Sequence, residues 1–143
     1  QAIGEAICAG CLNSIIADVE AASAECKTPT EQRRDLFSTL ASDSVRLFFN
    51  DRKLYDLAAS ASTEKWPPAI SYAEELHKLV ARIVAEGRRT GEFERKTALD
   101  ETTRAIVGAM WVFMSPVNLQ FNLDSVPRLP NEIVAMILRS LAP

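Results

Sequence analysis

Apolar residues recur along most of this chain every three or four positions, which is the spacing of one buried helix face. In the first 26 residues they fall at Ile3, Ile7, Cys8, Cys11, Leu12, Ile15, Ile16 and Val19. The spacing returns from Leu36 to Phe48, through Leu54, Tyr55 and Leu57, and from Ile70 to Val84. It predicts a helix to about Cys26, a second that ends near Asn50, a short third and a long fourth.

Prolines and a glycine mark where these helices begin and end. Thr28-Pro29-Thr30-Glu31 is typical of a helix start, because threonine caps the first turn and proline loses no hydrogen bond there. The tandem Pro67-Pro68 predicts the start of the long helix for the same reason. Gly91 follows Arg88 and Arg89, and we expect it to end that helix in a left-handed conformation.

A further helix is predicted to open near Thr97, with Asp100 as its capping partner, and to stop at Ser115-Pro116. A helical wheel places Leu99, Ile106, Met110 and Met114 on one face, and Ala105, Gly108, Ala109 and Val112 on the other. We expect the first face to enter the core. Small residues allow close backbone approach, so the second face is expected to meet a second subunit.

A last helix is predicted from about Pro130. Its apolar stripe consists of Ile133, Val134, Ile137, Leu138 and Leu141. The stripe is broad enough to pack on the core and on a partner at once. The two final helices together predict a homodimer.

Composition supports a helical domain. Hydrophobic residues make up 48% of the 143 positions and aromatic residues 7%, a balance typical of packed helices. With no compositional break, residues 1–143 are expected to form one all-α domain, a bundle of about six helices. The net charge of -3 argues against a grip on DNA by this chain itself. No apolar run reaches the roughly 20 residues of a membrane span, so a cytoplasmic protein without membrane contact is expected.

Four potential zinc ligands stand out: Cys8-x-x-Cys11, Cys26 and His77. Structural zinc sites usually close with tight paired loops, whereas the first two cysteines share one face of a predicted helix. Buried thiols are the better interpretation, and no metal or other cofactor is expected.

Catalytic groups do not assemble by spacing. His77 is the single histidine and lies at the edge of an apolar helix face, where packing beside the core is favoured over chemistry. The acidic pairs Glu74-Glu75 and Asp100-Glu101 are adjacent, so on a helix their side chains point about a hundred degrees apart. The five glycines form no phosphate-binding loop. We therefore expect no enzyme.

Bulky apolar side chains are plentiful: Phe37, Phe48, Phe49, Tyr72, Met110, Trp111, Phe113 and Met114. Each taken singly is expected to be ordinary core. Together they could line an apolar pocket, because methionine adapts its shape and Tyr, Trp and His contribute polar atoms. The ligand-binding candidates are Phe37, Tyr72, His77, Met110, Trp111 and Met114. A filled core and an open pocket use the same residues, so both interpretations stay open.

Two stretches resemble the effector domain of TetR-family transcriptional regulators. The segment from Ile83 to Glu94, IVAEGRRTGEFE, resembles the glycine-bounded turn between a long helix and the first dimerising helix, and that next helix ends here in WVFMSP. The opening QAIGEAI resembles the start of the helix that follows the family's helix-turn-helix module. The order and lengths of the other helices fit, so the resemblance spans nearly the whole chain.

The resemblance implies a mechanism. A small, largely apolar effector shifts the population of two helix arrangements and changes the spacing of paired DNA-reading heads, usually to relieve repression. DNA is contacted only through an N-terminal helix-turn-helix module, which this chain lacks. The helices at about 98–115 and 130–142 form the dimer's four-helix bundle, which makes Ala105, Gly108, Ala109 and Val112 interface candidates, and Ile137 and Leu141 weaker ones.

Two other functions compete with this one. A helical protein-protein interaction module without a small-molecule pocket would bind its partner through residues 130–142. A cofactor-free helical enzyme ranks last, because no acid, base and nucleophile converge by spacing.

Overall fold

The computed structural model describes residues 52–115 and 128–143 without a break, together with residues 6, 10, 13, 14, 17, 18, 21, 31, 34, 35, 37–39, 42, 46, 118 and 124. Four helices have their bounds here: α3 (Arg52–Thr63), α4 (Pro67–Arg89), α5 (Leu99–Met114) and α7 (Arg128–Leu141). The described residues between 6 and 21, and between 31 and 46, are also helical. The all-α prediction is confirmed, and the described residues contain no strand.

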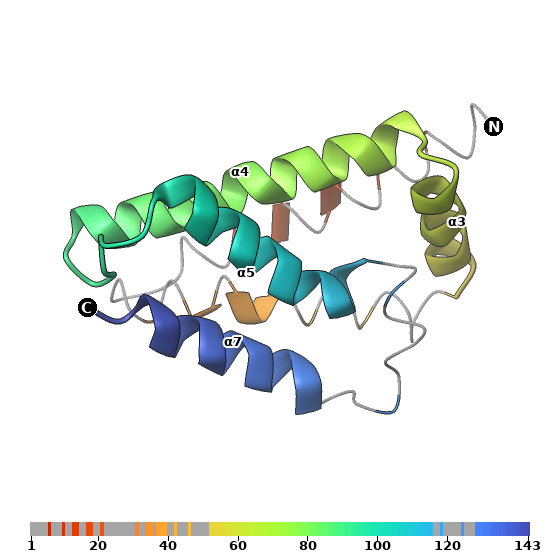
Figure 1. The fold of residues 1–143 in the computed structure, drawn as a ribbon. Helices are drawn as coiled ribbons and strands as arrows, with labels where there is room; N and C mark the ends of the chain where they lie inside the picture. The colour runs from red at the N-terminus through yellow and green to blue at the C-terminus, as the bar shows by residue number, and fades with distance from the viewer. Residues whose placement is uncertain are drawn as a thin grey trace.

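The longest helix, α4, organises the domain (Figure 1). It packs against α5, which in turn packs against α7, while α3 packs on α4 near the end at which α4 begins. The chain ends beside the turn that follows α4, where the backbone N–H of Glu94 donates to the carbonyl oxygen of Leu141 at 2.7 Å. This bond fixes the last turn of α7 to the connection between α4 and α5.

The prolines begin α4 as predicted. Trp66 is the N-cap residue in extended conformation, and Pro67 and Pro68 occupy the first helical positions, where no amide hydrogen bond is lost. Lys65, just before, has a positive φ of 56°. A residue with a Cβ rarely adopts this left-handed conformation, which occurs here in the turn between α3 and α4.

Gly91 ends α4 as predicted, with a φ of 84°. The preceding N–H of Thr90 still donates to the carbonyl oxygen of Glu86 at 3.1 Å. The backbone N–H groups of Glu92 and Phe93 then both donate to the carbonyl oxygen of Gly87, at 2.9 and 3.0 Å. The turn therefore satisfies the final carbonyl groups of the helix.

The predicted start of α5 is wrong by two residues. The helix begins at Leu99 rather than Thr97, and its N-cap, Ala98, receives no side-chain hydrogen bond, so Asp100 is not a cap. The backbone N–H of Thr97 instead donates to Glu94 Oε2 at 3.3 Å, within the connection that precedes the helix. The predicted end is confirmed, since α5 stops at Met114 and Ser115 is extended.

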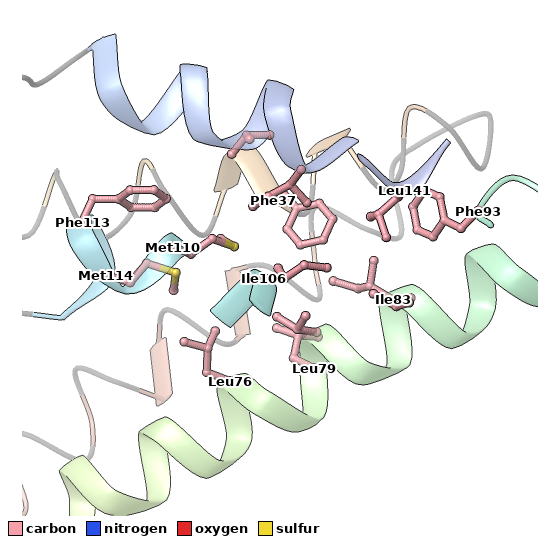
Figure 2. Close-up of a cluster of buried hydrophobic side chains, with 14 residues drawn as sticks. Phe37, Leu76, Leu79, Ile83, Phe93, Ile106, Met110, Phe113, Met114 and Leu141 are labelled. Atoms are coloured by element: carbon pink, nitrogen blue, oxygen red, sulfur yellow. The ribbon is translucent and has the colours of Figure 1, made fainter. Parts of the chain in front are cut away.

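The core forms where α4, α5 and α7 meet, and Figure 2 shows Phe37 lying among side chains from all three helices. Its buried members are Phe37, Leu76, Leu79, Val80, Ile83, Val84, Phe93, Ile106, Met110, Phe113, Met114, Val134, Ile137 and Leu141. The predicted inner face of α5 is confirmed, with Leu99 only half-buried. On α4 the expectation that Ile70 belongs to the buried face is wrong, because its side chain is 48% exposed, while Leu79 is buried.

Candidate functional site

Three of the six residues predicted to bind a ligand belong to the main core. Phe37 and Met110 are fully buried and Met114 is 2% exposed, and all three pack within one continuous cluster (Figure 2). Side chains in such a cluster fill its interior instead of bordering an opening. For these residues the ordinary-core interpretation is the one that the structure favours.

Tyr72 and Trp111 lie elsewhere. Tyr72 is buried with Ala58 and Ala61 in a second, smaller cluster between α3 and α4. Trp111 is half-buried and packs against both clusters. The structure therefore places these predicted ligand residues in two packed clusters, which Trp111 joins.

His77 is exposed on α4, so the prediction that it lies at the edge of the core is wrong. Leu76 and Val80 are buried, and the register of the helix places the histidine beside this buried face, where its side chain is exposed to solvent. The acidic pair Glu74-Glu75 is exposed too, and Glu75 accepts a hydrogen bond from Lys78 Nζ at 3.3 Å. These polar groups form a solvated face.

The small-residue face of α5 is open. Ala105 and Gly108 are exposed, and Ala109 and Val112 are half-buried. A Cβ atom built on Gly108 would meet nothing within 4 Å. Among the described residues, none of the subunit's own core covers this face of α5, which the sequence analysis assigned to a second subunit.

A groove of about 400 Å³ runs between this face and α7. Its lining comprises Glu94, Thr97, Glu101, Thr102, Ala105, Ile106, Ala109, Met136, Ile137, Ser140 and Leu141. Ile137 and Leu141 form part of its floor but are only 4% and 2% exposed, so they belong mainly to the subunit's core. Met136, 49% exposed, is the large apolar residue that α7 presents here. Sequence reasoning missed it because it lies outside the predicted stripe.

A second hollow, of about 530 Å³, lies on the other side of α7. Its apolar lining is Phe93, Val134, Ala135, Leu138 and Ala142, and its polar lining is Arg34, Ser38, Glu92, Asn131 and Arg139. We call it the arginine hollow. Sequence reasoning missed it, because it joins residues more than a hundred positions apart and no local pattern signals that meeting.

The turn from Gly87 to Glu94 connects the two surfaces, since Phe93 lines the arginine hollow and Glu94 the α5–α7 groove. Glu94 Oε1 lies 3.8 Å from Arg88 Nη2, with both side chains largely buried. Arg88 Nη2 also donates to Thr102 Oγ1 on α5 at 3.0 Å. Hydrogen bonds from the backbone N–H groups of Lys96 and Thr97, together with Arg88, lower the pKa of the Glu94 carboxyl. The turn is thereby fixed to the first turn of α5.

The described residues contain no group of three or more His, Cys, Asp or Glu side chains that could hold a metal ion. The zinc hypothesis itself lies outside them, because Cys8, Cys11 and Cys26 are not described. None of the described helices is both long and apolar enough to cross a membrane.

One of the comparisons with known proteins gives a match. Residues 29–125 match the family model described as tetracyclin repressor-like, C-terminal domain. No curated protein and no solved structure matches the chain. The matched segment includes α3, α4, α5 and the turn between the last two, which is more than half of the sequence. The chain belongs to the family of tetracyclin repressor-like C-terminal domains.

Proposed function

We propose that this chain is the ligand-sensing and dimerisation domain of a cytoplasmic TetR-like transcriptional repressor. It binds a small, largely apolar effector and thereby controls a helix-turn-helix module that precedes it and contacts DNA. The observation that carries the proposal is membership of the family over residues 29–125. The domain itself needs no catalytic group for this role, which requires only two arrangements that the effector distinguishes energetically.

The open face of α5 supports the homodimer. Ala105, Gly108 and Ala109 present little side-chain bulk, so a helix of a second subunit can approach the backbone closely. Met136, across the groove on α7, offers a flexible apolar side chain that adapts to such a partner. In a twofold dimer the same groove of each subunit receives the other, and α5 and α7 pair into a four-helix bundle.

The coding region immediately upstream of Gln1 tests the regulatory role. We expect roughly 45 to 50 residues with the basic, three-helix pattern of a helix-turn-helix module. An unrelated domain at that place would contradict the proposal. The protein-protein interaction module would then be the better interpretation, with the α5–α7 groove as its binding surface.

A further inference from the structure

We propose that the arginine hollow beside α7 binds a small monocarboxylic acid with an apolar body, whose carboxylate is held by Arg34 and Arg139. The proposal rests on the proposed function, because it names the chemical class of the effector. It places the effector site beside α7, outside the packed cluster that contains Phe37, Met110 and Met114.

Charge is the first argument. Among the described residues that line the hollow, Arg34 and Arg139 contribute guanidinium groups and Glu92 contributes a carboxylate. Glu92 Oε1 also accepts a hydrogen bond from Thr90 Oγ1 at 2.9 Å. No ion pair joins Arg34 or Arg139 to another residue in the described part of the chain. Among these described residues the cationic groups outnumber the anionic one, which favours an anionic ligand, and the planar guanidinium fork suits a carboxylate.

The apolar lining is the second argument. Phe93 and Val134 are almost fully buried, and Leu138 is half-buried against the core. These side chains form a firm apolar floor, whereas both arginines are exposed. The volume of about 530 Å³ falls within the range of roughly 300 to 1,000 Å³ that is typical of small-molecule sites. An apolar floor with a cationic rim matches a molecule that carries one anionic end.

The position of α7 gives such a ligand a route to the dimer. Val134 and Leu138 line the arginine hollow, while Met136 lines the α5–α7 groove on another face of the same helix. A ligand that favours one position of α7 therefore changes the surface offered to a second subunit. Coupling of this kind is reciprocal, so dimerisation also changes the affinity for the ligand.

Octanoate is the probe for the test, with 1-octanol, octylammonium and octyl phosphate as matched molecules. Isothermal titration calorimetry on the full chain is expected to show octanoate binding at least ten-fold more tightly than each of the three. Arg34→Gln and Arg139→Gln should each weaken octanoate about ten-fold and leave octanol nearly unchanged. Arg104→Gln, an exposed arginine of α5 outside the hollow, is the matched control and should bind as the parent does.

A filling variant separates the hollow from the rest of the surface. Ala135 is exposed on α7 and lines the hollow, so Ala135→Trp should block octanoate while the thermal unfolding curve stays cooperative. Equal binding of octanoate and octanol, or octanoate affinity unchanged in both arginine variants, overturns the proposal. A dimer that ignores octanoate overturns this proposal alone. If the chain is a monomer in solution, the proposed function is wrong. Octanoate binding that depends on the two arginines would still support the binding site.

Discussion

The ring of Phe93 lies against the Cα of Gly87, where a side chain on residue 87 would have to stand. A Cβ atom at this position would come within 2.6 Å of Phe93 Cγ and closer still to two other ring atoms. Phe93 is 7% exposed and its backbone N–H donates to the Gly87 carbonyl, so a Cβ atom on residue 87 would force a buried ring or the turn to shift. The contact holds the turn after α4 against the core and fixes where Glu94 meets the end of α7.

Gly87→Ala is expected to destabilise the domain by about 1 to 2 kcal/mol in urea unfolding. Overpacking of this kind costs about 1 to 3 kcal/mol, of which the better helix propensity of alanine offsets up to about 1. In a Phe93→Ala background the clash is gone, so Gly87→Ala should be neutral or stabilising there. The same loss in both backgrounds would show that the ring is not what excludes a side chain.

Glu94→Gln should flatten the dependence of stability on pH. Folding lowers the pKa of this carboxyl below its ordinary value of 4.5, so its contribution is present above that pH and is lost as the pH falls through the folded value. The free energies of unfolding of parent and variant, measured from pH 6 to pH 3, should therefore converge at the acid end of this range. Glu74→Gln, on the exposed side of α4 and outside the α5–α7 groove, serves as the control. A constant difference between parent and Glu94→Gln across this range would contradict the role given to the carboxylate.

Phe37→Ala is expected to cost about 3 to 5 kcal/mol, because a fully buried aromatic side chain leaves a cavity. A residue that borders an open pocket would cost far less. Ile70→Ala provides the comparison, since Ile70 is 48% exposed and its loss should stay within about 0.5 kcal/mol. Similar small losses for both variants in chemical unfolding would return Phe37 to the list of pocket residues.

Lys65→Gly should stabilise the domain slightly, by about 0.5 kcal/mol. Lys65 holds a φ of 56°, and glycine relieves that strain at some cost in chain entropy. A rise in melting temperature relative to the parent supports this account. Glu64→Gly, one residue earlier, has no positive φ to relieve and should lower the melting temperature.

The sequence predicted the helices better than it predicted the site. Proline and glycine chemistry is local, so Pro67-Pro68 and Gly91 placed both ends of α4. The periodicity of α5 separated its buried from its open face for the same reason. The start of α5 was placed two residues too early, because Thr97 is a residue type that favours a cap, whereas the helix begins after Ala98 without a side-chain cap.

The ligand candidates were chosen by side-chain chemistry, and that chemistry does not report where space is left. Met110 and His77 are both residue types that commonly line pockets. Met110 is nevertheless fully buried in the core, and His77 is exposed to solvent. The arginine hollow is lined by Arg34 and Arg139, which lie far apart in the sequence. Only the packing of α7 brings them together, so neither residue carried a signal in the sequence.

The mass of the chain in solution, measured by light scattering during gel filtration, tests the central claim most directly. The account predicts twice the 15.8 kDa of one chain, with Ala105→Glu and Gly108→Leu shifted to a monomer because both place bulk on the open face of α5. Ala85→Glu, a matched change on the exposed side of α4, should remain a dimer. A monomeric parent, or variants that dimerise as well as the parent, would contradict the dimerisation surface on which the proposed function depends.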